Sequence, residues 1–261
     1  MTFVEKLRKR KQEARTMLCV GLDPDKDLIP IDSILKFNKK IIDETSPFVC
    51  AYKPNLAFYL VSGWMESVLV DTIEYIHENY PNIPVILDGK FGDTGNSSKM
   101  YAKAVFDGFK ADAVTVNPYL GQDALQPFLD YEDKGIFVLC HTSNLGSKEF
   151  QDLVVQPPAR PPYNSCPLGE QVAFEVAHYW NRNNNCGLVV GATFPEQLKR
   201  VRKIAGDLLI LVTGVGVQGG DLEAAVKYGS IINASRSVIY AEKPGREAKK
   251  LRRRMQCQNI R

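Results

Sequence analysis

The run Asp88-Gly89-Lys90-Phe91-Gly92-Asp93 places an acid, a base and a second acid at positions i, i+2 and i+5. Charged groups this close together in a concave site shift one another's pKa values. A lysine held between carboxylates stays protonated and acts as a proton donor, because a Schiff-base lysine needs a lowered pKa. In a strand, Asp88 and Lys90 have the same side-chain direction, so both can point into the mouth of a barrel. The simpler interpretation is structural: Asp88 caps a helix or forms a buried ion pair with Lys90.

A second polar segment, residues 214–220, has the composition of an anion site. Four of its seven residues are glycine, so backbone N–H groups can turn towards an anion. A helix beginning near Asp221 would add the positive end of its dipole. Arg236, which follows the next apolar run, can bind phosphate oxygens through two N–H groups at once. The two segments together predict a phosphate site between neighbouring strands.

Short apolar runs alternate with helix-favouring segments along the whole chain. The Val, Ile and Leu content of these runs is typical of parallel strands buried on both faces. Eight such units predict an α/β fold, a (β/α)8 TIM barrel. A doubly wound open sheet is the alternative, but it needs a GxGxxG after the first strand, where this chain has Gly21-Leu22-Asp23-Pro24-Asp25. The predicted strands are residues 17–22, 49–53, 85–87, 113–117, 136–140, 188–190, 208–212 and 231–233, and the predicted helices are residues 31–44, 64–79, 96–109, 122–131, 168–182, 195–205, 221–227 and 245–254.

Charged and polar residues follow several of these strands, where the chemistry of such barrels gathers. Asp23 ends the first strand, Lys53 the second and Asp88 the third. The proline-rich residues 156–163 cannot continue a helix or a central strand. This segment is interpreted either as a lid over the site or as a plain surface loop.

Composition restricts the class of protein. With 261 residues, 44% of them hydrophobic and 24% charged, and no break in composition, residues 1–261 are expected to form a single barrel domain with an N-terminal helix and a basic C-terminal helix. We expect no secretory signal and no membrane partner, because no apolar run approaches the roughly 20 residues of a membrane span. A net charge of +3, concentrated at residues 6–11 and 249–254, indicates solvated helix faces and no nucleic-acid partner.

The six cysteines are scattered singly, without a CxxC motif, and the three histidines lack zinc-ligand spacing. Buried free thiols in a reducing cytosol are the favoured interpretation, and disulfides are the alternative.

The polar motifs resemble orotidine 5′-phosphate decarboxylases. Asp88-x-Lys90-x-x-Asp93 followed by residues 94–97 (TGNS) resembles the signature of this family, and residues 21–25, 53–55, 142–144, 216–221 and 235–240 match its other landmarks in order. The match runs from about residue 16 to residue 241 and is most similar to the longer, type 2 branch. It implies a cytoplasmic homodimer that converts orotidine 5′-monophosphate to uridine 5′-monophosphate and CO2 in de novo pyrimidine biosynthesis. This carboxy-lyase needs no cofactor and no metal.

The resemblance also implies roles for the matching residues. Lys90 would protonate C6 of the pyrimidine as CO2 leaves, within an alternating charge network of Lys53, Asp88, Lys90 and Asp93. Asp88 would lie close to the substrate carboxylate, and a fixed ammonium beside the developing carbanion fits cofactor-free chemistry. Asp93 and Ser97 would reach across the dimer interface into the partner's site. The expected substrate contacts are Asp23, Lys53 and the Asp93 region for ribose, Ser143 for the pyrimidine, Gln218 and Arg236 for phosphate, with Gly216 and Ser235 beside them.

Three positions depart from the family pattern. Thr213 stands where proline is usual, and Gly89 and Phe91 stand where alanine and arginine are frequent. None of these changes removes a charged group.

Two other functions remain as alternatives. A metal-dependent sugar-phosphate decarboxylase or aldolase of the same superfamily would need additional carboxylate ligands. A non-catalytic nucleotide-binding barrel would keep Gln218 and Arg236 but lose the alternation of Lys and Asp.

Overall fold

Eight parallel strands form the centre of the protein. The description rests on a computed structural model and covers residues 1–29, 33–61, 65–156, 165–216 and 218–258. The sheet consists of β1 (Leu18–Leu22), β2 (Ala51–Pro54), β3 (Ile86–Phe91), β4 (Ala113–Val116), β5 (Gly135–His141), β8 (Cys186–Gly191), β9 (Leu209–Thr213) and β10 (Ile231–Ala234).

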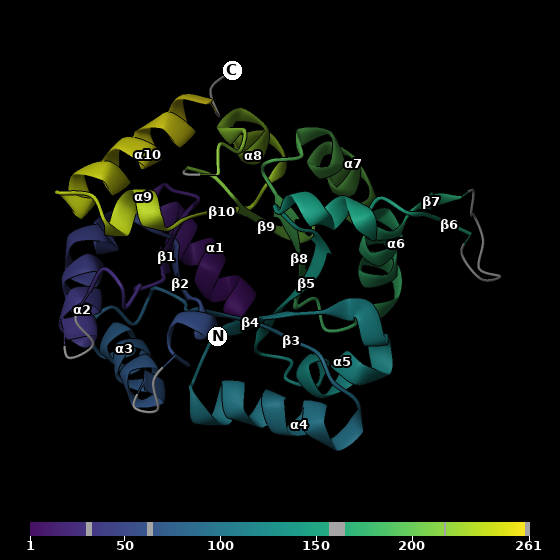
Figure 1. Ribbon diagram of the computed structural model, residues 1–261, viewed down its shortest axis with the longest axis horizontal. Coiled ribbons are helices and arrows are strands. Elements are labelled where there is room, and N and C mark those ends of the chain that lie inside the picture. Colours follow the sequence, from purple (N-terminus) through teal and green to yellow (C-terminus); the bar gives the residue numbers. More distant parts are fainter. Residues whose placement is uncertain (30–32, 62–64, 157–164, 217, 259–261) are drawn as a thin grey trace.

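The sheet closes on itself into a barrel. Its strand order is β2-β1-β10-β9-β8-β5-β4-β3, and every neighbouring pair within it is parallel. The two edge strands, β2 and β3, are joined by bridges from Tyr52 to Val85 and from Asn55 to Asp88. Helices surround the strands (Figure 1). The predicted TIM barrel is confirmed, and the open doubly wound sheet is excluded.

The helices lie where the apolar periodicity predicts them, although several of their ends differ. The predicted helix at residues 96–109 is α-helical only as far as Lys103, and the one at residues 168–182 only as far as Glu175; each continues as a π-helical turn, over Ala104–Gly108 and Val176–Trp180. The helices are α1 (Phe3–Ala14), α2 (Ile34–Thr45), α3 (Met65–Asn79), α4 (Gly95–Lys103), α5 (Gln122–Leu129), α6 (Leu168–Glu175), α7 (Pro195–Ala205), α8 (Leu222–Tyr228), α9 (Arg236–Ile239) and α10 (Pro244–Gln258).

Helix α1 covers the amino-terminal end of the barrel. Phe3 packs edge-on against Phe137 of β5, with ring centroids 5.7 Å apart. The expectation that the basic residues of this helix form a solvated face is wrong for Lys6, Arg10 and Lys11. Lys6 pairs with Asp112 at 3.1 Å, Arg10 donates to the carbonyls of Val49 and Ser46, and Lys11 donates to the carbonyl of Ser230. These carbonyls lie just before buried strands and need donors.

An antiparallel hairpin that the sequence did not indicate leaves the barrel after β5. Its strands are β6 (Val154–Val155) and β7 (Cys166–Pro167), and it projects away from the barrel (Figure 1). Of the predicted lid, residues 156–163, only Gln156 lies within the described residues.

All six cysteines lie in the described ranges and are free thiols, four of them buried. Burial raises the pKa of the Cys50 thiol to about 12, which keeps it protonated. Among the described residues, no helix has both the length and the apolar character needed to cross a membrane.

Candidate active site

A cavity of about 330 Å³ opens at the carboxyl ends of the barrel strands. This volume lies at the small end of the range for ligand pockets. Residues from at least six strands or the loops after them line it, as expected for chemistry at this end of a barrel. Eight of the predicted site residues line this cavity: Asp23, Lys53, Asp88, Lys90, Ser143, Gln218, Ser235 and Arg236. Asp93, Ser97 and Gly216 are not among the residues that line it.

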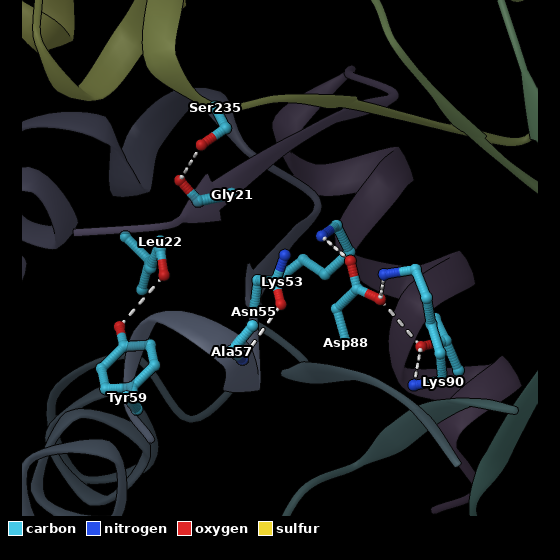
Figure 2. A network of polar contacts seen from close by, with 10 residues as sticks. Gly21, Leu22, Lys53, Asn55, Ala57, Tyr59, Asp88, Lys90 and Ser235 are labelled. Atoms are coloured by element: carbon cyan, nitrogen blue, oxygen red, sulfur yellow. Dashed lines mark hydrogen bonds and ion pairs between the residues drawn. The ribbon is translucent and has the colours of Figure 1, made fainter. Parts of the chain in front are cut away.

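Asp88 forms the centre of a charge network at the floor of the cavity. Its two carboxylate oxygens contact different lysines, Lys53 Nζ at 2.5 Å and Lys90 Nζ at 2.6 Å. Figure 2 shows the carboxylate between the two side chains. The exposed fraction of the side chain is 3% for Lys53, 7% for Asp88 and 47% for Lys90. All three side chains line the cavity, and Lys90 is the member of the network most accessible to a bound molecule.

Each charged group in this network stabilises the ionised form of its neighbour. Burial alone would raise the pKa of Asp88, but the ammonium groups of Lys53 and Lys90 outweigh it and lower that pKa well below its usual range. Burial likewise disfavours the charged form of Lys53, and the carboxylates of Asp88 and Asp23 reverse that effect and raise its pKa. Both groups are therefore ionised at neutral pH, and a negative charge is fixed beside the cavity.

Lys90 reaches the cavity through an irregularity in β3. Leu87 pairs with Val114 and Phe91 with Val116, so β3 advances four residues while β4 advances two. Lys90 itself has a φ of 50°, in the left-handed region that a lysine seldom adopts. Asp88 and Lys90 both face the cavity, as predicted. The regular alternation of side chains along a strand, on which that prediction rested, does not hold between them.

Thr115 of β4 holds this irregular segment in place. Its hydroxyl donates to Asp88 Oδ1 at 2.9 Å and accepts from the backbone N–H of Lys90 at 3.0 Å. The same side chain thus orients the carboxylate and fixes the backbone of the lysine. Sequence reasoning missed Thr115, and the available signal was a single polar residue inside the apolar run 113–116.

The two departures from the family pattern at positions 89 and 91 are sterically linked. A Cβ atom added to Gly89 would lie 2.1 Å from the ring of Phe91, so no side chain fits at position 89 while that ring is present. The ring packs against Tyr101 and Phe128, with centroids 5.1 and 6.2 Å away. Glycine at position 89 therefore accompanies phenylalanine at position 91 for a steric reason.

The predicted phosphate side of the cavity is formed by the end of β9 and the residues after β10. Gly214 has a φ of 84°, and a Cβ atom there would lie 2.8 Å from Gln218 Oε1, so glycine lets the Gln218 side chain fold back over the loop. Arg236 is exposed and lines the cavity from the first turn of α9. These two side chains supply amide and guanidinium donors on the same side.

Several backbone N–H groups of this glycine-rich loop donate hydrogen bonds within the protein. The N–H groups of Gly219 and Gly220 donate to the carbonyls of Gly216 and Gly214, at 2.9 and 3.1 Å. The N–H of Asp221 donates to Ala192 O at 2.9 Å, and the side chain of Asp221 caps α8. These three N–H groups already have acceptors within the protein and are not free to bind an anion.

The residues that follow β5 and β8 come together beside this loop, since a Cβ atom on Gly214 would also lie 2.9 Å from Ser143 Cβ. A Cβ atom on Gly191 would lie 2.6 Å from Ser143 Cα, so only glycine permits this close approach. Thr193 donates to the carbonyl of Ser143 at 2.9 Å. Next to it, the backbone N–H of Thr142 donates to Gln151 Oε1 at 2.7 Å. Both contacts fix the backbone that presents Ser143 to the cavity.

Asp93 and Ser97 lie on the outer rim, at the start of α4. Asp93 is half-buried and accepts the N–H of Thr94 at 2.7 Å, and Ser97 is exposed. Gly216, with a φ of 102°, lies against Ser237 rather than in the cavity wall. Among the lining residues that sequence reasoning passed over are Asn55, at the end of β2, and Asn233, on β10.

A metal centre would need a group of ligating side chains close together. Within the described residues, no group of three or more histidine, cysteine or carboxylate side chains is arranged to hold a metal ion. The described residues therefore do not bring together the additional carboxylates expected for a metal-dependent sugar-phosphate enzyme.

A sequence model of the family described as orotidine 5′-phosphate decarboxylase / HUMPS matches residues 16–251. The chain belongs to this family. Curated relatives agree. An orotidine 5′-phosphate decarboxylase of Cellvibrio japonicus is 45% identical over 256 residues, covering 92% of this chain and 90% of the relative. One of Ralstonia nicotianae is 45% identical over 254 residues, with coverage of 92% and 90%.

Solved structures have the same fold. The structure of Leishmania donovani OMP decarboxylase superposes with a TM-score of 0.88 at 36% identity, covering 100% of both chains. The structure of Leishmania donovani UMP synthase gives a TM-score of 0.90 at 37% identity over 99% of this chain, which spans 56% of that longer protein.

Proposed function

We propose that this protein is an orotidine 5′-monophosphate decarboxylase, a carboxy-lyase that acts without a metal or organic cofactor. Membership of the family and the curated relatives of that name support the assignment. The observation that carries it is the buried carboxylate of Asp88 between two ammonium groups that both line the cavity, with Lys90 far more exposed than Lys53.

The proposed chemistry is a decarboxylation followed by protonation of the same carbon. The bond between C6 and the carboxylate carbon breaks, CO2 leaves, and the electron pair stays on C6 of the pyrimidine. A proton then moves from Lys90 Nζ to C6, which yields uridine 5′-monophosphate and a neutral amine that water reprotonates. The ammonium of Lys90 stabilises the developing carbanion before it gives up its proton.

Asp88 has two functions in this proposal. Its negative charge, lying next to the substrate carboxylate, disfavours the bound carboxylate and not the neutral CO2 that leaves. It also keeps the ammonium of Lys90 in position at 2.6 Å. Lys53 makes the buried carboxylate possible, because it compensates the charge from the other side at 2.5 Å.

Substrate binding is assigned to the remaining walls of the cavity. Gln218 and Arg236 are proposed to bind the phosphate, with Gly216 shaping the loop beside them. Ser143 is proposed to bind the pyrimidine, and Asp23 and Lys53 the ribose. Ser235 lines the cavity next to the phosphate side. Contacts with the phosphate, far from C6, lower the barrier when they hold the substrate in place and exclude water.

We further propose a cytoplasmic homodimer in which Asp93 and Ser97 serve the partner's site. Exposed apolar side chains occur on α4 and on the turn after β4: Met100, Tyr101, Tyr119 and Leu120, with exposed fractions of 53%, 42%, 81% and 45%. Apolar side chains of this kind, together with two polar residues outside their own cavity, suit the surface of a second copy. Mixing inactive Lys90→Ala and Asp93→Ala chains should restore part of the activity, and no recovery in proven heterodimers would refute the shared site.

The decisive test of the activity is CO2 release from orotidine 5′-monophosphate by the purified protein in excess chelator. We expect full turnover under these conditions. Turnover of a sugar phosphate that appears only after adding Mg²⁺ would instead favour the metal-dependent alternative. Nucleotide binding without turnover of any phosphate substrate would favour a binding protein.

A further inference from the structure

Three successive carbonyl groups at the carboxyl end of β1 each accept a hydrogen bond from a side-chain hydroxyl. Ser235 donates to Gly21 O at 3.2 Å and Tyr59 to Leu22 O at 3.0 Å, as Figure 2 shows. Tyr240 donates to the next carbonyl, Asp23 O, at 3.2 Å. Two of the hydroxyls, those of Ser235 and Tyr240, flank helix α9, and the third comes from the segment after β2, so the backbone leading to Asp23 is held from two sides.

The position of these bonds follows from where the strand pairing ends. The ladder between β1 and β10 stops at the pair Val20–Ala234, and the ladder between β1 and β2 stops at the pair Leu22–Pro54. Carbonyls buried at this point need donors from elsewhere. Hydroxyl groups supply them.

Tyr240 makes the most extensive contact of the three. Its hydroxyl oxygen also accepts the N–H of Asp25 at 2.7 Å, so a single side chain spans both sides of the turn at Pro24. Its ring stacks on Phe37 with centroids 5.8 Å apart and an interplanar angle of 27°. Burial raises the pKa of Tyr240, which keeps the hydroxyl protonated and able to donate.

The turn carries Asp23, and what this side chain can bind depends on its position. Asp23 lines the cavity, and its Oδ1 atom is buried without a hydrogen-bond partner in the described part of the chain. Its negative charge also helps to raise the pKa of Lys53. An unpaired buried acceptor costs free energy unless a ligand satisfies it, so its exact position decides what it can bind.

We propose that Tyr240 is a positioning residue, which sets Asp23 for substrate by tying the turn after β1 to helix α9. Helix α9 begins with Arg236, on the proposed phosphate side of the cavity, and Tyr240 follows its last residue, Ile239. The backbone N–H of Tyr240 donates to Arg236 O at 3.3 Å. The same short segment therefore supplies the phosphate ligand and the support of the proposed ribose ligand. This inference rests on the proposed function.

The test uses Tyr240→Phe, which keeps the ring and its stacking on Phe37 and removes only the hydroxyl. Tyr131→Phe is the matched control, because the Tyr131 hydroxyl donates to Asp107 at 3.0 Å, away from the cavity-lining residues. We expect kcat/KM for orotidine 5′-monophosphate to fall roughly tenfold in Tyr240→Phe, mostly through KM, as expected when one positioning contact is lost. The control should keep its wild-type value, and both variants should unfold at similar temperatures.

A double variant distinguishes positioning from general loosening. If Tyr240 acts through Asp23, Tyr240→Phe should lower kcat/KM by less than about twofold in an Asp23→Asn background. A double variant whose loss is the product of the two single losses would overturn the inference, as would an effect on kcat with KM unchanged. If the wild-type protein itself does not release CO2, the proposed function fails first. Wild-type turnover with a fully active Tyr240→Phe variant refutes this inference alone.

Discussion

The buried pair of Asp88 and Lys53 makes a quantitative prediction about stability. Replacing Asp88 by asparagine keeps the shape of the side chain but leaves the Lys53 ammonium, 3% exposed, without its closest counter-charge. Breaking one partner of a buried pair typically costs about 3–5 kcal/mol of unfolding free energy. Asp23 still acts on Lys53, so we expect the lower end of that range, about 3 kcal/mol.

The natural control is the other lysine of the same network. Lys90 is 47% exposed, so solvent screens its pair with Asp88, and Lys90→Met should cost no more than about 1 kcal/mol. Asp88→Asn weakens both contacts, at 2.5 and 2.6 Å, whereas Lys90→Met removes only the second. The difference between the two losses therefore reports the buried contact between Asp88 and Lys53.

Equilibrium urea unfolding at about pH 7, followed by circular dichroism, measures both variants. With a slope of about 3 kcal/mol per M, Asp88→Asn should lower the midpoint by roughly 1 M and Lys90→Met by much less. If Asp88→Asn unfolds within about 1 kcal/mol of the wild type, the claim of a buried, mutually dependent ion pair is refuted. Equal losses in the two variants would refute the contrast in burial.

Two further predictions concern the site and the closed end of the barrel. Lys90→Ala should abolish CO2 release while calorimetry still detects binding of uridine 5′-monophosphate, because phosphate and ribose ligands remain; a nearly normal rate would exclude Lys90 as proton donor. Asp112 accepts hydrogen bonds from Lys6, His77 and the N–H of Val85, and these partners outweigh burial and lower its pKa. A lowered folded pKa stabilises the protein above the unfolded pKa of about 3.9, and this stability disappears as the pH falls through the folded value. Asp112→Asn should therefore lower the unfolding free energy by about 2 kcal/mol near pH 7 and by less in acid, measured as melting temperatures at both pH values; an equal loss at both would contradict the linkage.

Several elements of the fold could be predicted because the signal lies in the local pattern. Strands buried on both faces must be apolar along their whole length, and eight such runs alternating with amphipathic segments leave few architectures open. The boundaries were less predictable. Strand β3 continues through Asp88, Gly89 and Lys90, which lack apolar character, because Leu87 and Phe91 on either side of them pair with β4.

The sequence by itself determined which chemical groups stand at the strand ends, and it predicted acid–base chemistry for Asp88 and Lys90 and phosphate binding for Arg236. Only the tertiary structure decided which lysine is buried and which is accessible, because burial depends on neighbours distant in the chain. It also decided that Lys90 enters the cavity through a left-handed backbone conformation supported by Thr115. The hydroxyl of Tyr240 contacts Asp23, more than two hundred residues earlier, because closure of the barrel makes β1 and β10 neighbours. No local pattern encodes that contact.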